Sequence, residues 1–178
     1  VAVQGPYVYL ATGAGLQILT IADSGGLALV ALARTPVPVE SVTVAGRYAY
    51  MTVTPGTLLI ADVADPAAPL LLGAVSVPSF AKNVHVAGDL VYVANGNNGV
   101  AVVDVSDPSS PRLLGANKIG ALVTDVTVMG DHLLATDVFA GGLHVLDARN
   151  PGQLVETGVY RAPGVTHEVT AEEHYAYL

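Results

Sequence analysis

The sequence contains no cysteine and no tryptophan, and it has only 7 lysine and arginine residues among 178. Without cysteine the chain cannot form disulfides, Cys-ligated zinc sites, iron–sulfur clusters or a thiol nucleophile. The 15 acidic residues give a net charge of −8. This charge argues against nucleic acid as a partner, because that binding depends on a basic surface. Charged residues make up 12% of the chain and hydrophobic residues 52%, the opposite of a disordered sequence.

Long hydrophobic runs are also missing. A membrane-spanning helix needs about 18 consecutive apolar residues. The longest uncharged stretch, residues 1–22, is interrupted by a proline, polar residues and three glycines, so we expect no membrane-spanning segment. The motifs of nucleophile elbows, phosphate-binding loops and helical zinc sites are absent as well.

What the sequence does contain is an internal repeat. The run Val-Thr-Val-Ala-Gly-Arg-Tyr-Ala-Tyr at 42–50 has counterparts that begin at residues 1, 84, 126 and 169, so the period is 41 to 43 residues. A second shared piece follows in each complete unit and is clearest at 99–115. We therefore interpret 1–178 as a single domain made of repeats 1–41, 42–83, 84–125 and 126–168, with a partial repeat at 169–178.

Within a unit the apolar residues alternate with polar or small ones, which is typical of strands and not of helices. In the third unit this pattern predicts strands near 84–86, 90–94, 100–105 and 112–116. In the second unit it predicts strands near 48–53, 58–63 and 70–77. No segment has a helical stripe with a cap, so the fold class is all-β.

Four short antiparallel strands that recur about every 42 residues are the pattern of a β-propeller blade. Blades stack face to face and cover both faces of each sheet, which accounts for the apolar composition. The sequence predicts four blades and the start of a fifth. Because uncovered sheet edges and faces invite pairing, we expect either that these residues are part of a larger propeller or that they pack against copies or partners.

The residues of the repeat resemble those of the LVIVD-repeat β-propeller family. The resemblance lies in the run Gly-Val-Ala-Val-Val-Asp-Val-Ser-Asp-Pro-Ser-Ser-Pro-Arg-Leu-Leu-Gly at 99–115 and in the run at 42–50, and it extends over essentially the whole chain. Two local departures are Ser24-Gly25 in place of Asp-Pro and the altered turn at 149–151. The resemblance implies a secreted or surface-displayed protein, and it implies no particular activity.

A candidate binding site follows from the repeat. The innermost strand of each propeller blade lines the central channel, and the residues just before that strand lie at one mouth of the channel. These positions are polar in every unit: Glu40-Ser41, Lys82-Asn83, Thr124-Asp125 and His167-Glu168. Convergent polar groups at a concave mouth make this the candidate ligand site. A solvated mouth without a ligand is the favoured interpretation, because recurrence of polar residues alone does not show function.

Histidine adds a second hypothesis at the same place. His85 lies on an inner strand, at the position that threonine occupies in other units, so we expect it to face the channel. His167 could approach it, with Asp125 or Glu168 as a carboxylate neighbour, and such a set could bind a divalent metal. The ligand spacing of known zinc motifs is absent. Simple hydrogen-bonded or solvated histidines are therefore the favoured interpretation, and we assign no metal or cofactor.

Other conspicuous residues have structural interpretations. The segment 95–99, Asn-Gly-Asn-Asn-Gly, is interpreted as a turn and not as a calcium loop. His132 and the repeated Tyr-x-Tyr pairs are interpreted as packing residues. The aspartates that recur around the Asp-Pro turns are interpreted as turn caps: Asp23, Asp62, Asp65, Asp104, Asp107 and Asp147.

Three classes of function remain. The first is a non-enzymatic structural or protein-interaction module that is extracellular or displayed on the cell surface and binds a protein or copies of itself. The second is a metal-assisted hydrolase that uses the channel mouth. The third is a propeller that binds a small ligand or metal without chemistry. Metal content of the purified protein discriminates the first class from the other two.

Overall fold

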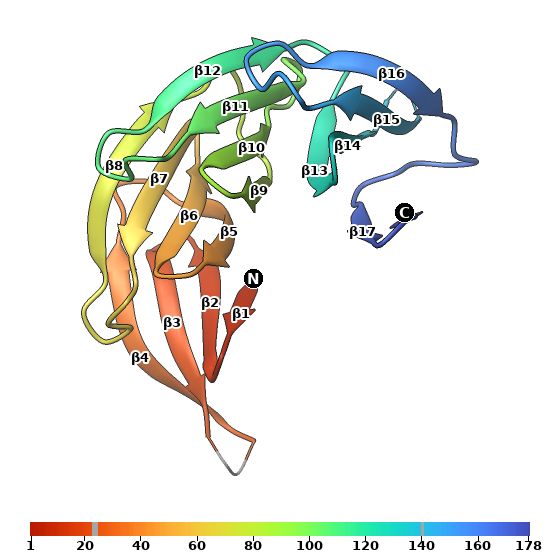
Figure 1. Ribbon diagram of the computed structural model, residues 1–178. Helices are drawn as coiled ribbons and strands as arrows, with labels where there is room; N and C mark the ends of the chain where they lie inside the picture. The colour runs from red at the N-terminus through yellow and green to blue at the C-terminus, as the bar shows by residue number, and fades with distance from the viewer. Residues whose placement is uncertain (23–24, 140) are drawn as a thin grey trace.

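The computed structural model describes residues 1–22, 25–139 and 141–178, and these residues fold into five antiparallel sheets placed side by side along an arc (Figure 1). Four of the sheets have four strands in sequential pairing, and the fifth has two. The described residues include no helix, and therefore none that could span a membrane. The expected all-β fold with four complete blades is confirmed.

The first blade comprises β1 (Ala2–Gln4), β2 (Tyr7–Thr12), β3 (Gly15–Ile21) and β4 (Leu27–Arg34). The second comprises β5 (Val39–Ala45), β6 (Tyr48–Val53), β7 (Thr57–Asp62) and β8 (Leu70–Ser76). The third comprises β9 (Val84–Ala87), β10 (Leu90–Ala94), β11 (Val100–Asp104) and β12 (Arg112–Asn117). The fourth comprises β13 (Val123–Met129), β14 (His132–Asp137), β15 (Gly142–Asp147) and β16 (Val155–Tyr160). The fifth sheet pairs β17 (Thr170–Glu172) with β18 (Tyr175–Tyr177).

Successive residues of a strand point to opposite faces of the sheet. In a blade that lies between two others, one set packs on the preceding blade and the other set on the following blade, so both faces are apolar. On β10, Val91 and Val93 pack in one cluster with Leu58 of the preceding blade, whereas Tyr92 packs in the next cluster with Leu133 of the following blade. The hydrophobic core is therefore divided into layers between the blades. This arrangement explains how so short a chain buries so many aliphatic side chains.

The Leu-Gly end of the repeat has a steric role. A Cβ atom placed on Gly73 would overlap the carbonyl oxygen of Pro108, and one placed on Gly115 would overlap that of Gly152. The turns after the third strands of the third and fourth blades thus rest on the outer strands of the second and third blades. Only glycine leaves room for this backbone contact.

Each outer strand also carries a bulge at the same repeat position. In the second blade Ile60 pairs with Gly73 but Ala61 pairs with Leu71, so Leu72 is an extra residue on β8. Equivalent register shifts occur in the other three complete blades. The bulge is therefore a feature of the repeat and not of one sequence.

The predicted turn caps are confirmed where the structure describes them. The backbone N–H groups of Ala64, Ser106 and Arg149 donate to the Oδ1 atoms of Asp62 (2.9 Å), Asp104 (2.9 Å) and Asp147 (3.0 Å). Arg47, Arg112 and Arg149 form ion pairs with the same three carboxylates. The turn cap expected at Asp23 and the departure at Ser24 lie outside the described residues.

Two packing predictions need correction. Tyr9 and Tyr50 are buried as expected, but Tyr175 and Tyr177 are 66% and 54% exposed. Ala171 of the β17–β18 hairpin packs on the fourth blade, whereas no described sheet covers the other face, which carries the two tyrosines. His132 is also exposed. It pairs with Met129 beside the tight turn between β13 and β14, where the hairpin reaches the edge of the sheet. The segment 95–99 does form a turn, in which the Asn98 N–H donates to the Asn95 carbonyl.

Candidate functional site

Strand register places the starts of the inner strands on one face of the arc. Val39 at the start of β5 pairs with Val53 at the end of β6, and Val123 at the start of β13 pairs with Asp137 at the end of β14. We call this side the mouth face. It carries the segments that cross from one blade to the next and the loops between the second and third strands.

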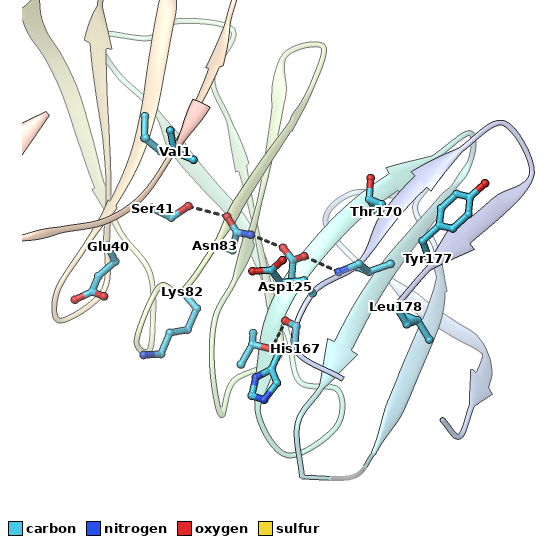
Figure 2. Close-up of a pocket in the computed structure, with 14 residues that line it drawn as sticks. Val1, Glu40, Ser41, Lys82, Asn83, Asp125, His167, Thr170, Tyr177 and Leu178 are labelled. Atoms are coloured by element: carbon cyan, nitrogen blue, oxygen red, sulfur yellow. Dashed lines mark hydrogen bonds between the residues drawn. The ribbon is translucent and has the colours of Figure 1, made fainter. Parts of the chain in front are cut away.

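An open hollow of about 790 Å³ lies on the mouth face where the inner strands begin (Figure 2). All eight polar positions that the repeat singled out line it, together with residues near both ends of the described chain. Five of the six candidate site residues are therefore brought to one hollow: Glu40, Lys82, Asp125, His167 and Glu168. His85 does not line it and lies farther along the channel wall.

A ladder of side-chain hydrogen bonds joins successive blades around this hollow (Figure 2). Ser41 Oγ donates to Asn83 Oδ1 (2.7 Å), and Asn83 Nδ2 donates to Asp125 Oδ1 (2.5 Å). Asp125 Oδ2 then accepts the backbone N–H of Val169 (2.8 Å). We call Ser41, Asn83 and Asp125 the rim ladder. Because these residues occupy one repeat position, 42 residues apart, the ladder links four consecutive inner strands.

Two of the ladder residues are also fixed to their own strands. Asn83 Oδ1 accepts the Val84 N–H (2.8 Å), and Asp125 Oδ1 accepts the Val126 N–H (2.9 Å). Both oxygens of the Asp125 carboxylate are thereby used in the fold, and the residue is only 6% exposed. The rim is held rigidly by these bonds.

Burial raises the pKa of Asp125 above its ordinary value, and the neighbouring charge of Glu168 adds to this increase. The hydrogen bonds from Val169, Val126 and Asn83 act in the opposite direction, since they stabilise the carboxylate. Desolvation is the larger effect. The site therefore contains a buried carboxylate, that of Asp125, whose charged form is stabilised by hydrogen bonds from Val169, Val126 and Asn83.

The outermost residues of the hollow present exposed side chains. Glu40 accepts a hydrogen bond from the Thr54 hydroxyl at 2.8 Å. The His167 carbonyl accepts hydrogen bonds from the hydroxyls of Thr124 (2.9 Å) and Thr136 (3.2 Å), while its imidazole is exposed. Lys82 is also exposed. The hollow thus offers both signs of charge to a ligand, above a rigid base.

His85 faces the channel, as its repeat position indicated. It lines an adjoining hollow of about 360 Å³ with Thr43, Thr127 and Thr170, and its Nδ1 lies 3.5 Å from Thr127 Oγ1. Burial lowers the pKa of His85. The hypothetical metal set is not assembled, because nowhere in the described ranges do three histidine, aspartate or glutamate side chains converge to hold an ion.

Sequence reasoning placed Ser41 and Asn83 at the mouth but did not assign them a role. The signal was available, since residues 41, 83, 125 and 168 are all polar at one repeat position. Sequence reasoning also missed a polar cluster in the fourth blade, in which His144 and Asp137 are buried and Glu156 is more exposed. His144 Nδ1 lies 2.6 Å from Glu156 Oε2, and its Nε2 lies 3.7 Å from Asp137 Oδ2.

Comparison with known proteins identifies the repeat. The family model of the LVIVD repeat matches residues 1–33, 38–77 and 80–117. A comparison with curated proteins finds no match.

Solved structures with the same fold share little sequence with the chain. They include the computationally designed Ika8 protein (12% identity, TM-score 0.76) and a functionally unknown protein from Desulfotomaculum acetoxidans (11%, 0.78). A third is AztD from Citrobacter koseri (14%, 0.66). They align with 98%, 93% and 94% of this chain, which in turn covers 52%, 55% and 47% of theirs. The chain thus spans about half their length, and the likeness supports the propeller fold alone.

Proposed function

Because the chain belongs to the LVIVD-repeat family, we propose that it is a non-enzymatic propeller module, located outside the cell or on its surface, that binds a protein through the mouth face. The partner is another protein or a further copy of the chain. The rim ladder is the observation that carries the proposal, because it fixes a set of polar groups around an open hollow.

A fixed rim favours recognition for an energetic reason. Association costs free energy when side chains must be ordered on binding, so a surface that is already ordered keeps more of its interaction energy. Asp125 and Asn83 are ordered by bonds within the fold, and they line the same hollow as the exposed side chains of Glu40, Lys82 and His167. The sequence contains no nucleophile, phosphate-binding or helical zinc motif that would favour catalysis instead.

A second candidate is a propeller that binds a small ligand at the same hollow, with or without a metal. The volume of about 790 Å³ favours it, since pockets for small molecules typically measure about 300–1,000 Å³. A hydrolase built on His85, Asp125, His167 and Glu168 has less support, because His85 and His167 line different hollows.

Site-specific photo-crosslinking in the native host tests the proposal. A photoreactive phenylalanine analogue is placed at Glu40, Lys82 or His167, and at Asp65 on the opposite face as the matched control. We expect crosslinks to a second polypeptide at the rim positions and not at Asp65. Equal or absent crosslinking at rim and control would contradict the proposal. The location is tested separately: protease added to intact cells should degrade the protein if it lies on the cell surface. A small molecule retained in native mass spectrometry, without crosslinks, would establish the second candidate.

A further inference from the structure

The only two phenylalanines of the chain are both exposed on the mouth face. Phe80 is 56% exposed in the segment that crosses from the second blade to the third, and Phe139 is 76% exposed after the end of β14. Large apolar residues of the inner strands, such as Leu133, are fully buried. Exposed aromatic side chains next to a polar rim are typical of interaction surfaces.

The two phenylalanines belong to one continuous surface. A Cβ atom on Gly96 would contact both the Phe80 carbonyl (3.3 Å) and Leu122 Cδ1 (3.8 Å), so the segments of Phe80 and Leu122 meet there. The Val138 N–H donates to the Leu122 carbonyl at 3.1 Å, which brings Leu122 beside Phe139. We call Phe80, Leu122 and Phe139 the apolar ridge. It extends over the third and fourth blades beside the channel mouth.

Two buried polar residues hold the ridge in place. Asn95 and Asp137 occupy equivalent repeat positions, and both are fully buried. Asn95 Oδ1 accepts the backbone N–H of Ser79 (3.1 Å), next to Phe80. The Asp137 carboxylate accepts the N–H groups of Leu122 (3.2 Å) and Phe139 (2.9 Å), and also that of Ala121. Asn95 and Asp137 thus hold in place the backbone segments that carry the apolar ridge.

The surroundings of the ridge indicate what could cover it. Beside Phe80 lies an open hollow of about 430 Å³, whose lining residues include Pro55, Val77, Pro78 and Phe80. The two lysines of the chain, Lys82 and Lys118, lie in the segments that carry Phe80 and Leu122, and both are exposed. Neither lysine forms an ion pair with any described residue.

We infer that the apolar ridge binds an extended polypeptide segment of a partner protein, with apolar side chains in the hollow beside Phe80 and carboxylates toward Lys82 and Lys118. This inference rests on the proposed function and adds the location and chemistry of the contact. A concave hollow receives individual side chains, whereas a bilayer surface calls for a convex one, so a polypeptide is favoured over a membrane. Acidic side chains lie on both faces, in the turns at the opposite ends of the strands and at Glu40 and Glu168 of the mouth. The two lysines therefore fix where the carboxylates of the segment bind, and not the charge of the whole face.

Peptide selection tests the inference. Random dodecapeptides displayed on phage are selected on the purified protein, and the enriched peptides are then tested for binding to a Phe80→Ser/Phe139→Ser variant. We expect enriched peptides that combine aliphatic or aromatic residues with Asp or Glu. Their dissociation constants should rise about tenfold or more with Phe80→Ser, because truncation of an interface anchor costs about 1.4 kcal/mol or more.

Matched variants distinguish binding at the apolar ridge from non-specific hydrophobic or electrostatic binding. Leu70→Ser removes an equally exposed apolar residue (62%) from the outer strand β8 and should leave binding unchanged. Lys82→Ala with Lys118→Ala should weaken binding and reduce its dependence on salt. Arg47→Ala, in the turn between β5 and β6 on the side opposite the mouth face, should do neither. Circular dichroism checks that each variant is folded.

Three results would overturn the inference. These are no enriched sequence, enriched peptides that bind the Phe80→Ser/Phe139→Ser variant equally well, and tighter binding to phosphatidylglycerol vesicles that the same variant abolishes. The last result would assign the ridge to a membrane surface. The crosslinking experiment distinguishes the two proposals. If one of these results is found but crosslinks from Glu40 or His167 to a partner persist in the Phe80→Ser/Phe139→Ser variant, the proposed function stands and only the assignment of the ridge fails.

Discussion

Replacing Asn83 by aspartate tests the rim ladder with the smallest change of shape. The two side chains are nearly isosteric, and one oxygen of the introduced carboxylate would still accept from Ser41 and from the Val84 N–H. The other oxygen, however, would replace the donor that lies 2.5 Å from Asp125 Oδ1. The substitution therefore puts two carboxylates in contact at a place where the native chain has a charge-assisted hydrogen bond.

The expected cost at neutral pH is about 3–5 kcal/mol of unfolding free energy. Loss of a hydrogen bond to a charged group costs about 1.5–3 kcal/mol. Repulsion between two charges about 4 Å apart near a protein surface is about 4 kcal/mol, which relaxation and proton uptake reduce. A proton shared between the two carboxylates restores an O–H···O contact at acidic pH, as in other carboxylate pairs.

The direction of the pH dependence follows from proton binding. Above about pH 4 the unfolded variant has released the shared proton, whereas the folded variant retains it, so unfolding free energy falls as pH rises. Burial already raises the pKa of Asp125 in the unaltered chain, which strengthens this tendency. Urea unfolding followed by far-ultraviolet circular dichroism at about pH 5 and about pH 8 measures the effect.

Asn83→Ala is the matched control for this experiment. It removes all the hydrogen bonds of the Asn83 side chain without adding charge, so it should cost about 2–4 kcal/mol, with a smaller change between the two pH values than Asn83→Asp shows. If Asn83→Asp and Asn83→Ala lose the same stability at both pH values, Asn83 and Asp125 are not in contact and the ladder is refuted.

Three further predictions concern the repeat itself. Val91→Ala, at a fully buried position between blades, should cost about 1–3 kcal/mol in urea unfolding, whereas Asn97→Ala in an exposed turn should be neutral; equal losses would mean that the strand faces are misassigned. Gly99→Ala should be more destabilising than Gly88→Ala, because both have positive φ but only the Gly99 Cβ would overlap a neighbouring backbone, and a reversed order of melting temperatures would contradict this packing. The pKa of Asp104 is lowered to about 2, mainly by hydrogen bonds from Ser106, so its contribution to stability is present above about pH 4 and is lost as pH falls toward about 2. Asp104→Asn should remove that part of the acid sensitivity in pH-dependent melting, and an unchanged acid profile would show that the cap contributes nothing.

Alternation of apolar residues was sufficient to predict the inner strands. The expected ranges 48–53 and 90–94 are those of β6 and β10. The third strands end one residue earlier than expected, at Asp62 and Asp104. The reason is that Val63 and Val105 are buried like strand residues, yet their N–H groups donate to the carbonyls of Arg47 and Asp89 in the adjacent hairpin turns.

Features that depend on contacts between blades were less accessible from sequence. The polar repeat position at the mouth predicted which residues gather there, but the directed bonds from Ser41 through Asn83 to Asp125 depend on the distance between neighbouring inner strands. Repeat equivalence failed for Tyr175 and Tyr177, because equivalence predicts the strand and not whether a sheet covers it. The exposure of Phe80 was not predicted, because the residue occurs at no other copy of its repeat position and the repeat pattern therefore assigns it no environment.

The bulge that recurs on every outer strand has a consequence for solubility. Outer strands are sheet edges with free backbone groups, and β8 exposes Leu70 and Leu71 without any charged residue among its seven. A flat edge of this kind is a template for the addition of further strands and the growth of aggregates. The extra residue at Leu72 breaks the regular spacing of donors and acceptors along that edge and increases its twist. Deletion of Leu72 should therefore increase aggregation, because the edge of β8 would then pair with strands of other molecules.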